Sequence, residues 1–200
     1  MNICYIVGAL NEAFHPFKYD DSDLIIACDK GYSILKCSNY RIDLIVGDFD
    51  SLGYVPKENN VLVLPKEKDV TDLHQCIEEG IKKGYSSFEI FGAIGGRFDH
   101  SIASIQDCYK YKIKGYNIKL YSPTQVIDFL FNEKKEVFKE KGYISVFSLS
   151  DVSKGVRIKN LKYELDNYEL KNTFPLGVSN EFINKKASIE VDDGCLIIIY

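Results

Sequence analysis

The stretch VLVLPKEKDVTDLHQCIEEGIKKGYSSFEIF, residues 61–91, decides the fold class. It begins with the apolar run Val61–Leu64 and ends with the apolar run Phe88–Phe91, and both runs predict buried strands. Between them, Asp69–Lys83 has apolar residues at helical spacing, acids in its first turn and lysines in its last. These signals predict a helix with Asp69 as its N-cap. A strand, a helix and a second strand in this order predict two parallel strands joined by a crossover helix.

The same alternation extends over the first 122 residues. Further buried strands are expected at four apolar runs: Asn2–Gly8, Asp23–Cys28, Ile42–Val46 and Asn117–Tyr121. A second helix is expected at Ser101–Lys112, with Ile102, Ile105 and Tyr109 on one face. We therefore expect residues 1–122 to form an α/β domain, a mostly parallel sheet with helices on both sides.

The chain changes character after Pro123, where helical periodicity gives way to short alternating segments. Strands are expected at three of these segments: Ile144–Leu149, Val156–Ile158 and Ile189–Val191. The sequence Asp192-Asp193-Gly194 separates Ile189–Val191 from the apolar run Cys195–Tyr200. It indicates a hairpin turn between these last two strands, with the glycine at positive φ. We therefore expect a second domain, antiparallel and all-β, over residues 124–200.

The composition excludes several classes of protein. With 46% hydrophobic and 27% charged residues in a chain of 200, it is typical of a globular protein. A net charge of −4 argues against binding to nucleic acid or to an anionic membrane surface. The longest apolar run, Cys195–Tyr200, is too short to span a membrane, and Met1–Leu10 does not look like a signal peptide. Six cysteines without a C-x-x-C pair favour buried free thiols in the cytoplasm over disulfides or zinc.

Ligands bind at the carboxyl ends of parallel strands, and Asp or Gly follows four of the first five expected strands. The four segments are Asp29-Lys30-Gly31, Gly47-Asp48-Phe49-Asp50-Ser51, Lys66–Asp72 and Gly92–His100. If the chain stays extended, Asp48 and Asp50 point the same way, and paired carboxylates suit Mg²⁺. Asp69 and Asp72 lie one helical turn apart, so one can cap the helix while the other faces the carboxylate cluster.

The segment Gly95-Gly96-Arg97 before a helix indicates an anion site, although a plain tight turn would also explain its glycines. Only three of the 25 basic residues are arginines, which favours a geometric reason for Arg97, because arginine grips phosphate with a planar fork. His100 is either a general acid or base or a structural hydrogen-bonding residue. His15 and His74 have no supporting context, and we assign them no role.

Converging carboxylates need a cation, so the sequence predicts metal-assisted phosphoryl or pyrophosphoryl transfer. A Mg²⁺-dependent phosphohydrolase and a nucleotide-sensing module remain as alternatives. Three motifs, in this order and spacing, then resemble the signature of bacterial thiamine pyrophosphokinases. They are Gly-Asp-Phe-Asp-Ser at 47–51, Asp-Val-Thr-Asp at 69–72 and Gly-Gly-Arg-Phe-Asp-His at 95–100. The stretch Ser179-Asn180-Glu181 resembles that family's C-terminal substrate motif, so the resemblance covers essentially the whole chain.

The resemblance implies a Rossmann-like α/β nucleotide-binding domain followed by a β-sandwich, assembled as a homodimer with active sites between subunits. It implies transfer of pyrophosphate from ATP to the hydroxyethyl group of thiamine, which gives thiamine diphosphate and AMP. A thiamine-sensing module that binds without turnover remains an alternative to this enzyme. Asp48, Asp50 and Asp72 would bind Mg²⁺ on the ATP phosphates. The implied catalytic residues are Asp72, Arg97 and Asp99, with Arg97 on the phosphate oxygens and Asp99 beside it.

Nucleotide-binding roles are implied for Asp29, Ser51, Thr71, Gly95, Gly96, Arg97 and His100. Ser179 and Asn180 of the partner subunit would contact the thiamine pyrimidine. Many members of the family have Asp-Gly-Gly where this chain has Asp29 followed by Lys30, which leaves the role of Asp29 open. The chain has no tryptophan, so another residue stacks on thiamine or none does.

Overall fold

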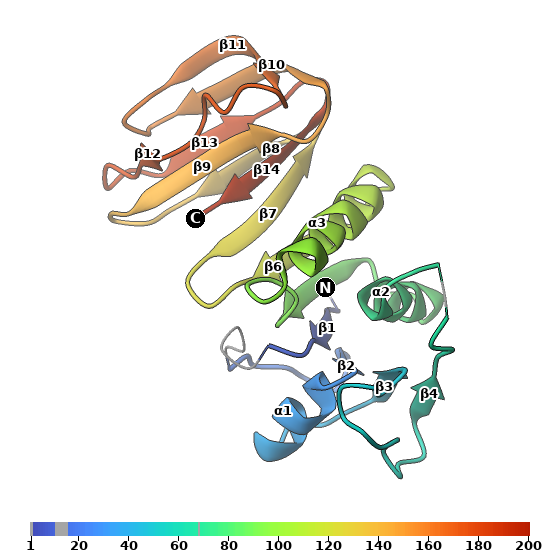
Figure 1. Ribbon diagram of the computed structural model, residues 1–200. Helices are drawn as coiled ribbons and strands as arrows, with labels where there is room; N and C mark the ends of the chain where they lie inside the picture. Colours follow the sequence, from blue (N-terminus) through green and yellow to red (C-terminus); the bar gives the residue numbers. More distant parts are fainter. Residues whose placement is uncertain (1, 11–15, 68) are drawn as a thin grey trace. The chain divides into compact units, whose positions relative to one another are not determined.

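The computed structural model describes residues 2–10, 16–67 and 69–200 of a mixed α/β chain (Figure 1). The chain divides into two compact units. Unit 1 comprises Met1–Tyr111 and Gly115–Thr124, and unit 2 comprises Lys112–Lys114 and Gln125–Tyr200. No helix in the described ranges is long and apolar enough to cross a membrane. His15, which received no role above, lies outside these ranges, as does Lys68 of the segment after the fourth expected strand.

Six strands of unit 1 lie in the order β6-β5-β1-β2-β3-β4, and every neighbouring pair is parallel. Their bounds are β1 Cys4–Val7, β2 Leu24–Cys28, β3 Leu44–Gly47, β4 Val61–Val63, β5 Ser87–Phe91 and β6 Asn117–Tyr121. The expected parallel sheet is therefore confirmed. The expectation that β4 is buried was wrong, because β4 is an edge strand and Val63 is 55% exposed.

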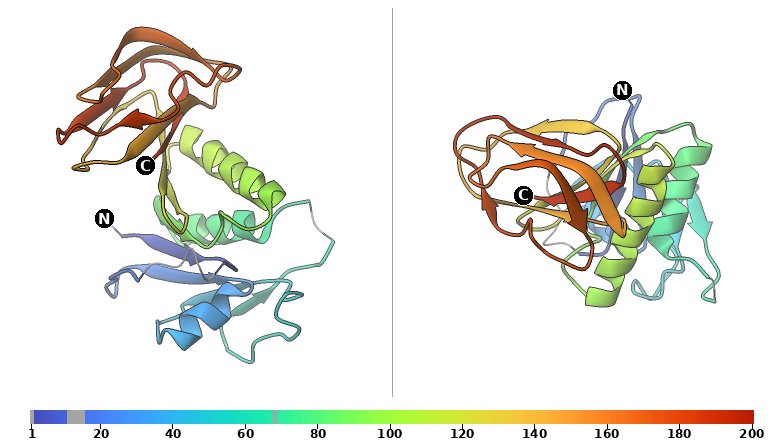
Figure 2. Two further views of the ribbon diagram at one scale, coloured as in Figure 1. Left: turned by 60° about the vertical axis from the view of Figure 1, so that its left-hand side comes forward. Right: turned by 90° about the horizontal axis from the view of Figure 1, so that it is seen from above.

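Helices cover both faces of this sheet: α1 (Gly31–Cys37) on one and α2 (Asp72–Lys82) on the other. The third helix, α3, spans Phe98–Ile113. In the left view of Figure 2, α1 lies below the strands while α2 and α3 lie above them. A Cβ added at Gly80 of α2 would come within 2.6 Å of the Phe88 ring, so the helix packs directly on β5. The sequence reasoning did not anticipate the short helix α1.

Both expected helices exist, but their starts and one face differ from expectation. Thr71, not Asp69, caps α2: its backbone is extended and its hydroxyl accepts the His74 N–H at 3.0 Å. On α3 the buried side chains include Cys108 and Tyr111, whereas Ile102 is 43% exposed. Ile102 shares a helical face with Ile105 and Tyr109 as expected, but the side that α3 turns toward α2 is the one with Tyr111.

Unit 2 contains two antiparallel sheets, in the orders β12-β9-β14-β7 and β11-β10-β13-β8. The bounds are β7 Val126–Phe131, β8 Lys134–Val137, β9 Tyr143–Ser148, β10 Val152–Lys159, β11 Leu165–Lys171, β12 Asn180–Glu181, β13 Ala187–Glu190 and β14 Cys195–Ile199. Buried side chains from both sheets, among them Ile144, Val156, Ile189 and Leu196, form one apolar cluster. The predicted antiparallel β character of this region is confirmed.

The predicted hairpin at Asp192–Gly194 was wrong. β13 pairs with β8 and β10, whereas β14 pairs with β7 and β9, so this segment crosses from one sheet to the other. Gly194 does have positive φ, at 117°. The Arg157 guanidinium holds Asp192 in the crossing segment through two bonds of 2.8 and 3.0 Å. Sequence spacing cannot distinguish such a crossing from a hairpin, because both need a tight turn.

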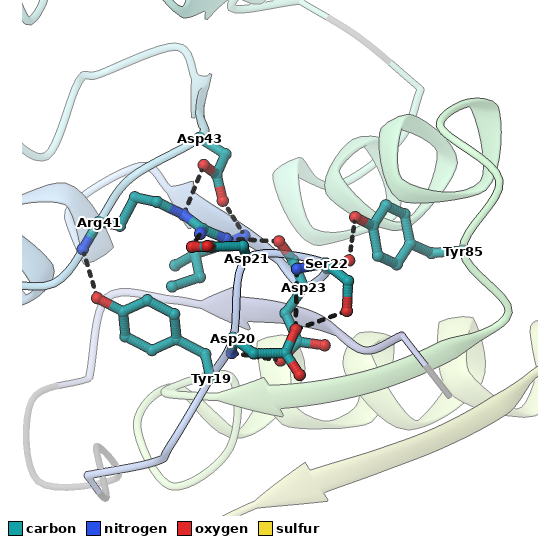
Figure 3. Close-up of polar contacts among 9 residues, drawn as sticks. Tyr19, Asp20, Asp21, Ser22, Asp23, Arg41, Asp43 and Tyr85 are labelled. Atoms are coloured by element: carbon teal, nitrogen blue, oxygen red, sulfur yellow. Dashed lines mark hydrogen bonds and ion pairs between the residues drawn. The ribbon is translucent and has the colours of Figure 1, made fainter.

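At the amino ends of β1, β2 and β3, charged side chains hold the starts of the strands (Figure 3). The Asp23 carboxylate accepts the Ile3 N–H, and the Asp43 carboxylate accepts the Ile25 N–H, both at 2.8 Å. Arg41 joins them, since its guanidinium lies 2.9 Å from the Asp43 carboxylate and donates to the Asp23 carbonyl at 2.6 Å. We call Asp20, Asp23, Arg41 and Asp43 the amino-end cluster.

Candidate functional site

The carboxyl ends of the unit 1 strands and the first turns of α2 and α3 surround a cavity of about 530 Å³. Eight of the residues predicted to act at the site line it: Asp29, Asp48, Ser51, Thr71, Asp72, Gly96, Arg97 and His100. Three others, Asp50, Gly95 and Asp99, are not in the wall but neighbour residues that are. The convergence expected from strand order therefore occurs, with residues 29, 48, 72 and 97 around one space.

Asp29 follows β2 with a left-handed backbone, φ 49°. Its Oδ2 accepts a short hydrogen bond from the Ser51 hydroxyl. Its Oδ1 is buried and accepts no hydrogen bond from any residue that the structure describes. Because a buried carboxylate oxygen without a donor is costly, this atom fits a ligand that brings a cation or a donor.

Lys30, which stands where many members of the resembled family have glycine, fits this loop without backbone strain. It lies at φ −61° in the right-handed helical region, as the N-cap of α1, so this position does not need glycine. The glycine that is required is Gly31, where an added Cβ would lie 1.8 Å from the Val7 carbonyl oxygen. The chain thus keeps the close approach of this turn while it carries a side chain at Lys30.

The Gly-Asp-Phe-Asp-Ser segment does not stay extended, as the sequence reasoning assumed. Phe49 has φ 60° and its ring is buried in the core, so Asp48 and Asp50 do not lie in strand-like alternation. Asp48 lines the cavity, and Asp50 instead forms an ion pair of 2.5 Å with Lys66. Lys66 itself lines the cavity. The sequence reasoning placed it in the segment after the fourth expected strand but gave it no role, because it lies outside the Asp-Val-Thr-Asp motif.

The Asp-Val-Thr-Asp segment starts α2 at the cavity wall. Thr71 and Asp72 both line the cavity, whereas Asp69 is exposed and lies outside the wall. Both stand at the N-terminal end of the helix, whose positive potential favours an anionic ligand. The Asp72 carboxylate is also placed to bind a cation that accompanies such a ligand.

The Gly-Gly-Arg-Phe-Asp-His loop starts α3 on the other side of the cavity. Arg97 donates to both Asp99 oxygens, at 2.6 and 3.2 Å, and Asp99 also accepts the His100 N–H at 3.0 Å. The hydrogen bond from Arg97 lowers the pKa of Asp99, and the same bond raises the pKa of Arg97. Gly95 has φ 111°, and an added Cβ at Gly96 would crowd Leu10 at 2.8 Å. The positive φ therefore requires glycine at Gly95, whereas at Gly96 the movable end of the Leu10 side chain would have to shift. The loop presents an oriented guanidinium.

In unit 2, the predicted thiamine residues have different environments. Ser179 is exposed with φ 56°, whereas Asn180 is 5% exposed. The Asn180 amide accepts the Tyr163 N–H at 2.9 Å and donates to the Tyr163 carbonyl at 2.6 Å. Asn180 thus fixes the backbone of Tyr163, whose own side chain is 61% exposed. Sequence reasoning missed this link because the two residues are 17 positions apart.

Within residues 2–10, 16–67 and 69–200, no group of three or more His, Cys, Asp or Glu side chains is arranged to hold a metal ion. Mg²⁺ commonly takes only one or two protein carboxylates and completes its shell with phosphates and water. The carboxylates of Asp48 and Asp72, with the unsatisfied oxygen of Asp29 nearby, fit that mode of binding. The donor set therefore suits Mg²⁺ that arrives with a phosphate ligand.

Comparison with known proteins identifies the family. The model of the thiamin pyrophosphokinase catalytic domain matches residues 18–120, and that of the thiamin pyrophosphokinase vitamin B1 binding domain matches residues 130–196. The chain belongs to the thiamin pyrophosphokinase family. It is 29% identical to thiamine pyrophosphokinase from Bacillus subtilis over 188 residues, which cover 90% of this chain and 88% of that protein. It is 25% identical to thiamine pyrophosphokinase 1 from Arabidopsis thaliana, over 89% of this chain and 72% of the plant protein.

Solved structures agree with this membership. The crystal structure of the Bacillus subtilis thiamine pyrophosphokinase matches with a TM-score of 0.86 at 26% identity, over 99% of this chain and 98% of that one. A thiamin pyrophosphokinase family protein from Enterococcus faecalis matches with a TM-score of 0.84 at 25% identity, over 100% and 98% of the two chains. The resemblance to the bacterial enzymes is thereby confirmed. Membership indicates an enzyme with thiamine pyrophosphokinase activity, a transferase and kinase that acts on thiamine and ATP.

Proposed function

We propose that the cavity of unit 1 catalyses the transfer of pyrophosphate from ATP to the hydroxyethyl group of thiamine, giving thiamine diphosphate and AMP. The observation that carries the proposal is the convergence of Asp48, Asp72 and Arg97 on one cavity, on a chain of this family. In the reaction, the thiamine hydroxyl oxygen bonds to the β-phosphorus of ATP. The bond from that phosphorus to the α–β bridging oxygen breaks, and AMP leaves.

We assign Asp48, Asp50 and Asp72 as the residues that hold Mg²⁺ on the ATP phosphates. The bound ion supplies neutralisation of charge on the phosphates. Asp48 and Asp72 line the cavity already, whereas Asp50 must first leave its ion pair with Lys66. Lys66 is then released beside the same phosphates, so the exchange keeps positive charge in the cavity.

We assign the remaining residues of the cavity to the nucleotide. Arg97 holds phosphate oxygens with its planar fork, and Asp99 orients that fork through two hydrogen bonds. The further nucleotide contacts are assigned to Asp29, Ser51, Thr71, Gly95, Gly96 and His100. Three groups are candidates to accept the proton of the thiamine hydroxyl: Asp72, Asp99 and a phosphate oxygen. A weak base is sufficient, because a loose transition state demands little base catalysis.

We propose that residues 1–122 form a Rossmann-like nucleotide domain and residues 124–200 a β-sandwich that binds thiamine. The parallel sheet of unit 1 and the shared apolar cluster of unit 2 support these assignments. Ser179 and Asn180 of the partner subunit contact the thiamine pyrimidine in this proposal, so the working enzyme is a homodimer. Six cysteines without a disulfide support a cytoplasmic location.

The test is AMP formation from ATP and Mg²⁺, measured with and without thiamine. We expect thiamine-dependent AMP, and loss of it in folded Asp48→Asn and Asp72→Asn variants by roughly 10²–10³-fold. Release of inorganic phosphate regardless of thiamine would instead indicate a phosphohydrolase. Tight binding of ATP or thiamine without turnover would indicate a sensor.

A further inference from the structure

A hydrogen-bonded cluster joins α2 to α3 at and behind the cavity wall, and the proposed reaction assigns a role only to its member Thr71. Its centre is the carboxylate of Asp107, on α3. Asp107 Oδ2 accepts the Thr71 hydroxyl at 2.9 Å, and Asp107 Oδ1 lies 2.7 Å from Nδ1 of His74. Thr71 Oγ1 in turn accepts the His74 N–H at 3.0 Å. Three residues from two helices therefore close a ring of hydrogen bonds.

The cluster continues away from the cavity. The Tyr111 hydroxyl lies 3.1 Å from Nε2 of His74 and donates to the Glu78 carboxylate at 2.6 Å. A carboxylate only accepts, so Nδ1 of His74 carries the proton toward Asp107. The His74 and Asp107 side chains are only 13% and 14% exposed, so water competes weakly for these bonds.

The near end of the cluster is part of the cavity wall. Thr71 is the N-cap of α2, and Asp72 is the first residue of that helix. On α3, His100 and Ser104 line the cavity, and Asp107 follows them on the same helical face at i+7 and i+3. The Asp107 carboxylate thus ties the first turn of α2 to the helix whose start carries the phosphate-binding loop.

We infer that Asp107, acting through Thr71 and His74, is a positioning residue that sets Asp72 against Arg97 for pyrophosphate transfer. This inference rests on the proposed function, since only that function makes the spacing of the two residues matter. Catalysis by positioned charges is steep in distance, and a misplacement of about 1 Å can cost roughly 10²-fold in rate. Residues that orient a metal ligand typically contribute about 10- to 100-fold.

The test compares Asp107→Asn with Glu78→Gln. An asparagine has no negative charge and replaces one of the two accepting oxygens by an amide donor, so it cannot accept from both Thr71 and His74 as the carboxylate does. Glu78→Gln weakens the far end of the same cluster and serves as the matched control. We expect kcat at saturating ATP and thiamine to fall about 10- to 100-fold in Asp107→Asn and to change less than about twofold in Glu78→Gln, with similar small losses in Tm. His74→Gln carries the test if Asp107→Asn does not fold, and its kcat should also fall.

Amide hydrogen exchange supplies a readout that does not need activity. Exchange in residues 71–76 should accelerate in Asp107→Asn and not in Glu78→Gln, because only the former frees the first turn of α2. Unchanged exchange and unchanged kcat in Asp107→Asn would overturn the inference. An equal loss of kcat in Glu78→Gln would also overturn it, since the cluster would then be merely structural. If the wild-type protein makes no thiamine-dependent AMP, the proposed function fails, while the exchange experiment still tests the tie between the helices.

Discussion

The two ends of the parallel sheet of unit 1 use the same residue type for opposite purposes. At the amino ends, Asp23 and Asp43 accept strand N–H groups and Arg41 joins them, so each carboxylate finds its donors within the chain. At the carboxyl ends, Asp29 keeps a buried oxygen for which the described residues provide no donor. The comparison shows that an aspartate beside a strand stabilises the fold when its donors are local. It becomes available for a ligand when they are not.

The largest expected difference between variants at the two ends of the unit 1 sheet is in the rate of catalysis. Asp48→Asn should reduce thiamine-dependent AMP formation by roughly 10²–10³-fold while Tm changes little, because the side chain lines the cavity. Asp43→Asn is the matched control at the amino end and should lower Tm while kcat is kept. Steady-state kinetics and thermal unfolding of both variants would measure this. Equal kinetic losses in the two variants would remove the distinction between the ends.

The next effect is on stability at the amino end. Asp23 is 8% exposed and accepts two backbone N–H groups, from Ile3 and Asp20. Asp23→Ala leaves these donors without a partner and should lower the free energy of unfolding by about 1–3 kcal/mol. Urea unfolding at neutral pH would measure this change. A variant as stable as wild type would show that water replaces the carboxylate at no cost.

A smaller effect is expected when Arg97 or Arg41 is replaced by lysine, which keeps the charge but not the planar guanidinium. Arg97→Lys keeps the charge but loses the fork that Asp99 orients, and should raise KM for ATP by about tenfold. Arg41→Lys should leave KM unchanged and lower Tm by a few degrees, because the described partners of the Arg41 side chain are Asp21, Asp23, Asp43 and the Tyr19 ring, all at the amino end. If Arg41→Lys changed KM for ATP, the two ends would be coupled rather than independent.

The smallest effect concerns pH. A hydrogen bond from the Ser22 hydroxyl holds the pKa of Asp20 below its usual value. Since the pKa is lower in the folded state, the carboxylate contributes stability above the unfolded pKa of about 3.9, and this contribution is lost as pH falls below it. Asp20→Asn should therefore make the decline of Tm between about pH 4 and pH 2 slightly shallower. Parallel declines in variant and wild type would show that this bond is not linked to folding.

Part of the fold and of the site could be predicted from local patterns. The segment 61–91 shows its strand, helix and strand by periodicity alone, and the Asp-rich motifs follow the strand ends where a parallel sheet places ligands. By contrast, the left-handed backbone of Phe49 and the short helix α1 escaped prediction. The Phe49 ring is buried in the core, so burial and not local propensity accounts for its backbone.

What the sequence determined by itself is the strand–helix alternation of residues 61–121, the family and the motifs that meet at the cavity, because these depend on residue type and on spacing along the chain. Only the tertiary structure decided which partners each side chain finds. It pairs Asp50 with Lys66, sends Asp192–Gly194 from one sheet to the other and joins His74 to Asp107 across 33 residues. The physical reason is that periodicity reports contacts within one element, whereas these contacts form between elements whose mutual packing no local pattern contains.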